Sequence, residues 1–294
     1  MNPIFSRTFK AICTVVVAGM IAACGSSSTV DPFKPTRVVG LGDGYNDIRT
    51  ATGGAAPTVR TGAGTTSSVV ERVAAYFGQS NVVSYASAGA RIRDLASQID
   101  SVGSFSAGDL VVITAGTFDV KAAAIPATEA QTLVTQVQRL KTAGVKHILI
   151  MPVLDVSRTP WGRTNGFDTT ATNTFNTAVL TALSTEFGGQ SPNTVIYANA
   201  SGVTSLFLTA TSTTAFSPFT DTGYNGSTAT TPACGAATLA LNTAFATAGV
   251  SGCDASAANA SYGTMLFADG IHLTPAGNSW VAGYLYNATA QGWR

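Results

Sequence analysis

Charged residues are scarce in this sequence of 294 residues, because Asp, Glu, Lys and Arg make up only 11% of it. An average soluble domain carries about 25%. The net charge is +1, with no run of like charges and no internal repeat, so nothing indicates nucleic acid as a partner. Low charge combined with many small and hydroxylated residues favours an exported protein. With 45% apolar residues, the chain is long enough to bury one sizeable core.

The clearest apolar run lies at the N-terminus and is too short for a comfortable membrane span. Arg7 and Lys10 precede it, and it extends over residues 11–23. A positive start, a short apolar stretch and small residues before a cut are typical of a secretory signal peptide. We therefore expect residues 1–23 to be removed. This loss takes two basic and no acidic residues, so the mature chain is close to neutral.

The residue after this run is Cys24, preceded by Ala22 and Ala23. The segment resembles the bacterial lipobox, which implies lipidation of Cys24 and a membrane as partner through that lipid. Gly25 follows instead of aspartate, and this implies sorting to the outer membrane. Residues 24–35 would then be a tether between the lipid and the domain. An ordinary signal peptide with an incidental cysteine is the alternative.

Two of the four cysteines remain for the folded domain. Cys13 leaves with the signal peptide and Cys24 carries lipid, which leaves Cys234 and Cys253. In an oxidising compartment we expect these two to pair, and so to tether an irregular insertion at about residues 209–262. Neither has a histidine nearby in the sequence, so we expect no metal, and nothing indicates a cofactor.

Strand-like and helix-like segments alternate through residues 36–294, which predicts one α/β domain. Its architecture is expected to be three-layered, α/β/α, around a central parallel sheet, with a site at the carboxyl ends of the strands. The expected strands are residues 37–41, 81–85, 110–114, 145–153, 194–198 and 264–268. The expected helices are residues 67–77, 92–99, a segment from the capping-box pair Thr128 and Gln131 to Gly144, one through Phe175, Val179 and Leu183, and one from Thr274.

A candidate reactive pair follows the last expected strand. Asp269 stands three residues before His272, one of only two histidines in the chain. On a turn, such a carboxylate can orient one ring nitrogen while the other nitrogen acts as a base. A hydrogen-bonded pair with a purely structural role is the alternative. The other histidine, His147, lies at the edge of an expected strand and is interpreted as structural.

Four segments together resemble the conserved blocks of the GDSL/SGNH hydrolases, in the order that this family has them. They span nearly the whole mature chain. The resemblance implies the flavodoxin-like SGNH hydrolase fold and the activity of a carboxylic ester hydrolase, a lipase or esterase. The segments are Gly42 and Asp43 with Asp47, residues 85–90, residues 116–119 and residues 267–277.

Two positions depart from the family pattern. Family members carry the nucleophilic serine where this chain has Gly44, and an oxyanion-hole asparagine where it has Phe118. The oxyanion-hole glycine, at Gly89, and the histidine, at His272, are retained. Glycine has no hydroxyl with which to form an acyl-enzyme. Phenylalanine has no donor for a developing oxyanion, a loss that typically costs ~10²–10³ in rate.

We derive three hypotheses from these departures. The first is a non-catalytic outer-membrane lipoprotein that retains the hydrolase cleft for an acyl-ester or glycan ligand. The second is an active ester hydrolase in which His272 and Asp269 activate water, or in which Tyr45 or Ser87 supplies the nucleophilic hydroxyl. The third is a structural surface lipoprotein without a ligand. Under the third hypothesis Gly44 and Gly89 merely suit turns and Phe118 packs in the core. The oligomeric state is not readable from the sequence.

Overall fold

The structure is a computed structural model that describes residues 32–48, 57–60, 67–189, 194–199, 232–235, 253–260, 262–291 and 293. The expected signal peptide, Cys24 and most of the expected insertion at 209–262 lie outside the described residues. Within the described part of the chain, no helix combines the length and the apolar character needed to cross a membrane.

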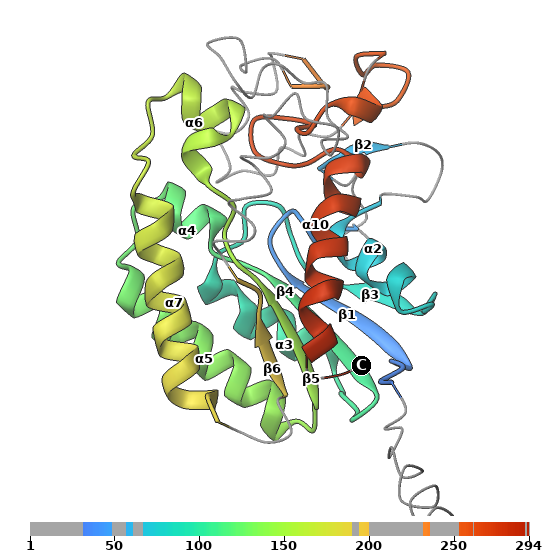
Figure 1. Cartoon of the computed structure of the whole chain (residues 1–294), viewed down its shortest axis with the longest axis vertical. Helices are drawn as coiled ribbons and strands as arrows, with labels where there is room; N and C mark the ends of the chain where they lie inside the picture. Colours follow the sequence, from blue (N-terminus) through green and yellow to red (C-terminus); the bar gives the residue numbers. More distant parts are fainter. Residues whose placement is uncertain are drawn as a thin grey trace, which may run out of the picture. The chain divides into compact units, whose positions relative to one another are not determined.

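A parallel sheet of five strands forms the centre of the domain, as predicted (Figure 1). Its order is β3-β1-β4-β5-β6, and every pair of neighbours is parallel. The side chains of β4 are all buried, and those of β5 nearly all, because helices cover both faces of the sheet. The strands are β1 (Arg37–Gly42), β3 (Val82–Ser84), β4 (Asp109–Thr114), β5 (His147–Met151) and β6 (Val195–Tyr197).

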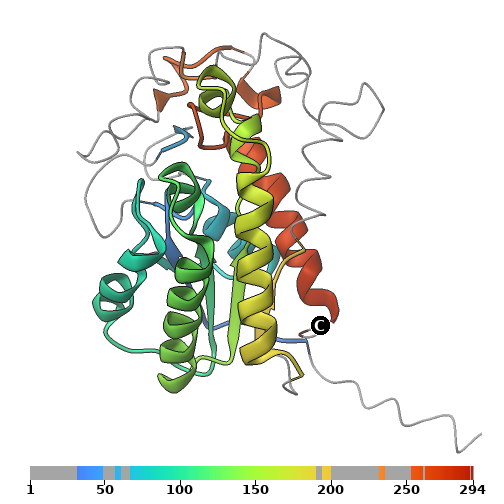
Figure 2. The same cartoon turned by 90° about the vertical axis from the view of Figure 1, so that its left-hand side faces the viewer.

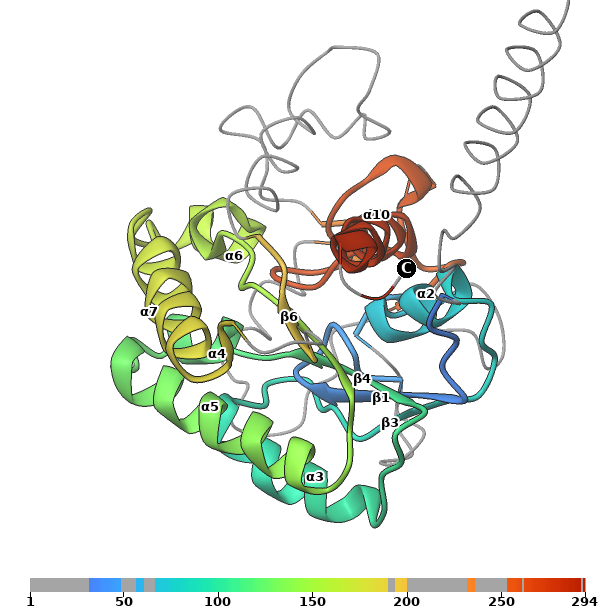
Figure 3. The same ribbon diagram turned by 60° about the horizontal axis from the view of Figure 1, so that its bottom comes forward.

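Two layers of helices flank this sheet, which confirms the three-layer architecture (Figures 2 and 3). On one face α2 packs against α10, and on the other α5 packs against α3 and α7. The short helices α4 and α6 follow strands β4 and β5. The helices are α2 (Val69–Tyr76), α3 (Leu95–Val102), α4 (Thr117–Lys121), α5 (Pro126–Thr142), α6 (Pro160–Thr164), α7 (Ala171–Phe187) and α10 (Pro275–Ala288).

The strand order reverses at β1, and this places the site. The chain passes from β1 to β3 on one side and then returns to β4 on the other. In doubly wound sheets with this order, ligands bind at the carboxyl ends of the strands where the order reverses. Gly42 ends β1 and Thr114 ends β4, and the two residues are paired in the sheet register. The segments after these two strands therefore leave from the same edge of the sheet.

One expected helix start was wrong. The capping-box spacing of Thr128 and Gln131 predicted a start at Thr128, whereas α5 begins at Pro126 with Ile125 as its N-cap. Proline suits the first helical position because its φ is already helical and its missing N–H would have no partner there. Helix α2, by contrast, begins after Ser68 with a capping box, in which the side chains of Ser68 and Glu71 each accept the other residue's backbone N–H.

The expected last strand, residues 264–268, was also wrong. Residues Tyr262–Thr264 form a 3₁₀ turn, and Phe267 makes only an isolated antiparallel bridge with Leu273. The carbonyls of Phe267 and Ala268 accept the N–H groups of Ala233 and Cys234. Residues 267–273 thus form a closed loop, here called the Asp-His loop, that pairs with another loop and stays outside the sheet. The helix expected from Thr274 is present as α10, capped by the Thr274 side chain.

A second, two-stranded parallel sheet lies next to this loop. It consists of β2 (Val59–Arg60) and β7 (Cys253–Asp254). The structure contains the expected disulfide between Cys234 and Cys253. Val59 and Ala233 form a small buried cluster with Ala268, against which both cysteines pack. The disulfide therefore belongs to a separate small core beside the Asp-His loop.

Candidate functional site

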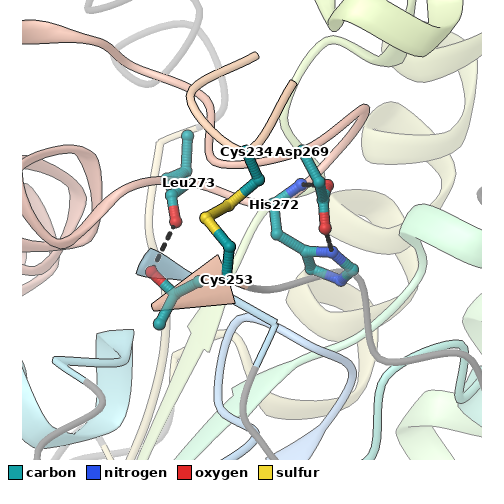
Figure 4. Close-up of a disulfide and its surroundings, with 6 residues drawn as sticks. Cys234, Cys253, Asp269, His272 and Leu273 are labelled. Atoms are coloured by element: carbon teal, nitrogen blue, oxygen red, sulfur yellow. Dashed lines mark hydrogen bonds and ion pairs between the residues drawn. A yellow bond between two sulfur atoms is a disulfide. The ribbon is translucent and has the colours of Figure 1, made fainter. Parts of the chain in front are cut away.

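The Asp269 and His272 side chains form a hydrogen-bonded pair, as the sequence predicted (Figure 4). His272 Nδ1 lies 2.8 Å from Asp269 Oδ2. The other carboxylate oxygen, Oδ1, accepts the N–H groups of Ile271 and His272 at 2.7 Å each. Both side chains are almost completely buried. One carboxylate thus orients the imidazole and closes the turn that carries it.

Nearby carboxylates raise the pKa of the buried His272 imidazole. Burial by itself would lower the pKa of His272, but the charge of Asp269 and its hydrogen bond outweigh this effect. The carboxylates of Asp43 and Asp47 act in the same direction, and the pKa of His272 is raised above its ordinary value. A general base must be unprotonated to accept a proton. The same kind of carboxylate stabilises the imidazolium that forms when the base of a catalytic triad takes up a proton, so this electrostatic support is compatible with either role.

The segment after β1 holds Gly44 in a tight turn. The Asp43 N–H donates to Thr114 O at 2.6 Å, and the Asp47 N–H donates to Gly44 O at 3.3 Å. Gly42 needs to be glycine because its φ is +108° and a β-carbon there would overlap the Thr114 carbonyl. Gly44 has no positive φ. The backbone of this turn would therefore accept a side chain at position 44.

The His272 ring occupies the space that a side chain at Gly44 would need. A β-carbon built on Gly44 would overlap Nε2 of His272 and would lie 2.5 Å from its Cδ2. In a working pair the nucleophilic oxygen itself lies about 2.6–3.2 Å from the nitrogen of the base, and its β-carbon lies further away. The missing serine is thus more than a change of one side chain, because the imidazole fills the vacated volume.

Aromatic rings flank this imidazole on two sides. Phe118, in the first turn of α4, is buried, and its ring centroid lies 6.0 Å from that of His272. The ring of Tyr45 makes an edge contact at 5.7 Å. Phe118 offers a hydrocarbon surface where the family motif has an amide donor. The structure therefore places the Phe118 ring beside His272, where it packs as a buried side chain.

Two backbone donors are retained near this position. Gly89 sits in a turn with φ +84°, and the neighbouring Ala88 N–H donates to Asp47 Oδ2 at 2.8 Å. This bond ties the Gly89 turn to the segment after β1. Within the described residues, neither the Gly44 N–H nor the Gly89 N–H donates to a protein acceptor. The two glycines thus keep amide hydrogens of the kind that stabilise an oxyanion.

The two alternative hydroxyls are not placed as nucleophiles. The Tyr45 hydroxyl is buried and donates to Ile271 O at 3.0 Å, which makes Tyr45 a support of the Asp-His loop. Ser87 donates its backbone N–H to Gly42 O, and no hydrogen bond joins its side chain to His272 in the described part of the structure. The geometry therefore gives no support to a substitute hydroxyl.

Two buried carboxyl groups of this region were missed by sequence reasoning as titrating groups. Asp43 is fully buried, and burial raises its pKa to about 7. Asp119 accepts the Ile92 N–H at 3.1 Å, and burial raises its pKa to about 6. Both belong to the recognised motif segments. Only their burial, which the sequence does not show, makes them titrate near neutral pH.

Other features lie apart from this site. Within the described residues, no group of three or more His, Cys, Asp or Glu side chains could hold a metal ion. A cavity of about 690 Å³ is lined by the ends of α7 and α10 and by β6, and by none of the site residues above. His147 contacts the Trp293 ring at 5.0 Å, and burial lowers its pKa to about 4.

Comparison with known proteins identifies a matching family. The family model described as GDSL-like lipase/acylhydrolase matches residues 38–285. Among solved structures, a lipase/acylhydrolase from Enterococcus faecalis matches with a TM-score of 0.47 and 11% identity, over 86% of this chain and 94% of its own. Axe2, an acetylxylan esterase from Geobacillus stearothermophilus, matches with a TM-score of 0.47 and 17% identity, over 90% and 98%. A comparison with curated proteins found no match.

Proposed function

Since the chain belongs to the GDSL-like lipase/acylhydrolase family, we propose that it is a catalytically silent member of that family. In this proposal the protein is anchored to the outer membrane by lipid on Cys24. It retains the Asp269–His272 pair as part of the fold and does not hydrolyse esters at the family site. An acyl ester or a glycan is the proposed ligand class, and the match to a lipase/acylhydrolase family supports the acyl ester.

The overlap between His272 and the β-carbon position of Gly44 carries the proposal. Family-type ester hydrolysis needs a hydroxyl that attacks the carbonyl carbon and a neutral imidazole that takes its proton. Here the hydroxyl is absent and the His272 ring fills its place. Phe118 removes a further donor from the oxyanion site. Each change alone impairs the reaction, and together they support activity near background.

Hydrolysis of p-nitrophenyl acetate and p-nitrophenyl butyrate tests this proposal. We expect the purified full chain and its His272→Ala variant to give the same rate, equal to that of buffer. Ester cleavage by the unchanged chain that disappears in His272→Ala would refute a silent site. Cleavage that persists in the variant would indicate hydrolysis away from this site or a contaminant. An active family esterase serves as the positive control for the assay.

Direct attack by water is a second candidate, favoured by one observation. The Asp269–His272 hydrogen bond is intact, and the Gly44 and Gly89 amides remain available as donors. In that case the rate should rise with pH through the pKa of His272, because only the neutral ring activates water. It should also be lost in His272→Gln. A rate that depends only on hydroxide concentration, and is the same in the unchanged chain and in His272→Gln, would exclude attack by activated water. The catalytically silent site would then be the remaining explanation.

Lipidation and location rest on the sequence around Cys24. Cells fed radiolabelled palmitate should label the chain, and Cys24→Ser should abolish the label. Fractionation should recover the unchanged chain with outer membranes. Labelling of Cys24→Ser, or recovery of the unchanged chain in the soluble fraction, would contradict the anchor without affecting the conclusions on the site.

A further inference from the structure

The Asp-His loop, residues 267–273, is held by contacts from outside itself. It belongs to no sheet, and its one internal bridge joins Phe267 to Leu273. From the side of the main sheet, the Tyr45 hydroxyl donates to Ile271 O and the Trp161 N–H donates to Gly270 O. These two bonds fix the tip of the loop. Its two flanks are joined to each other, because the Ala268 N–H donates to His272 O at 2.8 Å and Thr274 donates its N–H and hydroxyl to the carbonyls of Leu266 and Met265.

The disulfide patch, defined as residues 58–59, 233–234 and 253, holds those flanks. On the side before Asp269, the Ala233 N–H donates to Phe267 O at 2.9 Å, and the Cys234 N–H donates to Ala268 O at 2.8 Å. On the side after His272, the Thr58 hydroxyl donates to Leu273 O at 2.9 Å (Figure 4). The patch therefore forms hydrogen bonds with the backbone immediately before Asp269 and immediately after His272.

The disulfide joins two separate segments of the patch. Among the described residues of the patch, regular structure is limited to the two-residue pairing of β2 with β7, in which Val59 aligns with Cys253. The Cys253 N–H donates to Thr58 O at 3.1 Å, so the residue that holds Leu273 is itself held by a cysteine. The disulfide then joins Cys253 to Cys234, which holds Ala268. A single covalent bond thus connects the two supports of the pair.

We infer that the Cys234–Cys253 disulfide, with Thr58, positions the Asp269–His272 pair, so that reduction of this bond by a dithiol loosens the pair. Both cysteines are half-buried, so a small reductant can reach them. In the reaction, a dithiol such as dithiothreitol passes two electrons and two protons to the cysteines. These become thiols while the reagent closes to its own disulfide. The inference deepens the proposed function, since it concerns the same site.

The chain provides an internal control for the test, because it has only two histidines. The full chain in detergent is labelled with ¹⁵N-histidine, and the imidazole signals are followed by NMR against pH, before and after dithiothreitol. Reduction is verified by alkylation and mass. We expect the hydrogen-bonded Nδ1–H signal of His272 to broaden and its pKa to fall, because Asp269 moves away from the ring while burial continues to disfavour the charged form. The signals of His147, which packs on Trp293, should stay unchanged.

Variants separate positioning from general stability. Cys234→Ser combined with Cys253→Ser should reproduce the effect of reduction. Thr58→Val keeps the disulfide and removes only the bond to Leu273, so it should shift the His272 signals by a smaller amount. Thr132→Val is the matched control, because its hydroxyl bonds within α5 on an exposed surface. It should shift nothing.

Three results would overturn the inference. The first is that the His272 signals do not move on reduction, and the second is that both histidines change together because the whole fold is lost. The third is that Thr58→Val behaves like Thr132→Val, which would remove Thr58 from the positioning contacts. None of these outcomes depends on ester hydrolysis. Failure of the inference and failure of the proposed function are therefore distinguishable.

Discussion

The two halves of this site differ in what their side chains do for the fold. The segment after β1 presents Gly44, whose backbone needs no glycine and whose missing side chain leaves every bond of the turn in place. The Asp-His loop carries Asp269, whose carboxylate accepts two backbone N–H groups and orients His272. In the family pattern, the residue at position 44 supplies only the nucleophile. Asp269 both orients the histidine and accepts the backbone bonds that close its turn.

Under the proposed function, this contrast would explain how one half of a catalytic arrangement persists without the other. A position with only a chemical role can become glycine without structural cost, and a neighbouring ring then takes the space. Removing Asp269 would leave a buried imidazole and two backbone donors without their acceptor. The presence of an Asp–His pair is therefore weak support for turnover. It shows that the loop is intact.

The largest expected effect is on the retained half. Asp269→Ala should destabilise the chain by about 3–5 kcal/mol, because it leaves one partner of a buried charged pair alone. Urea unfolding followed by circular dichroism measures this loss. Asp100→Ala is the control, since Asp100 pairs with Arg139 on an exposed surface and should change stability by less than about 0.5 kcal/mol. Similar values for the two variants would mean that Asp269 has no structural role.

The next prediction concerns two substitutions that introduce the family's serine and asparagine at positions 44 and 118. In a chain that carries Gly44→Ser, adding Phe118→Asn should raise kcat/KM for p-nitrophenyl acetate by ~10²–10³, because an oxyanion donor returns. Phe118→Leu is the matched control and should add nothing. If the double variant stays at the buffer rate while folding normally, the His272 ring does not yield its place to a serine. The assigned serine and asparagine positions would then be wrong or insufficient.

A third prediction concerns the overlap itself. Gly44→Ala should cost about 1–3 kcal/mol, as overpacking of a filled site does. In a His272→Ala background the same change should cost less, because the overlapping ring is gone. A double-mutant cycle measures this coupling. Gly263→Ala is the control, since a β-carbon there meets nothing within 4 Å. Equal costs of Gly44→Ala in both backgrounds would show that His272 does not occupy the space at position 44.

The smallest effect is the dependence of stability on pH. The folded pKa values of Asp43 and Asp119, about 7 and about 6, lie above the ordinary 3.8, so the folded chain binds more protons in that window. The raised pKa of His272 adds stability that is present below 6.5 and lost as pH rises through its folded value. His147 opposes these groups, because its pKa of about 4 removes stability as pH falls below 6.5. The net expectation is a higher Tm at pH 5 than at pH 8.

Thermal unfolding at both pH values, followed by circular dichroism, measures this difference, which we expect to be a few degrees. Asp43→Asn keeps an acceptor for the Tyr45 N–H and removes the titrating proton, so it should reduce the difference. A Tm that is higher at pH 8, or a difference that Asp43→Asn leaves unchanged, would contradict the assigned cause.

Local patterns predicted most of the fold. Strand β4 and helix α7 were predictable because a continuous apolar run and a helical spacing of Phe175, Val179 and Leu183 report burial directly. The expected strand at 264–268 failed for a different reason. Leu266, Phe267 and Ala268 are apolar and buried, as residues of a strand would be. Phe267 and Ala268, however, bond to residues 233–234 and not to the main sheet. Periodicity shows that a segment is buried and does not show which neighbour it meets.

Taken alone, the sequence determined the parallel α/β architecture, the positions of Asp269 and His272, the loss of the serine and the identity of the cysteine pair. Each of these follows from residue type or from spacing along the chain. Tertiary structure decided that the His272 ring fills the space beside Gly44 and that Asp43 and Asp119 are buried. It also decided that the disulfide patch bonds to the backbone of the Asp-His loop. These facts depend on distances between segments far apart in the chain, which packing sets and local pattern does not encode.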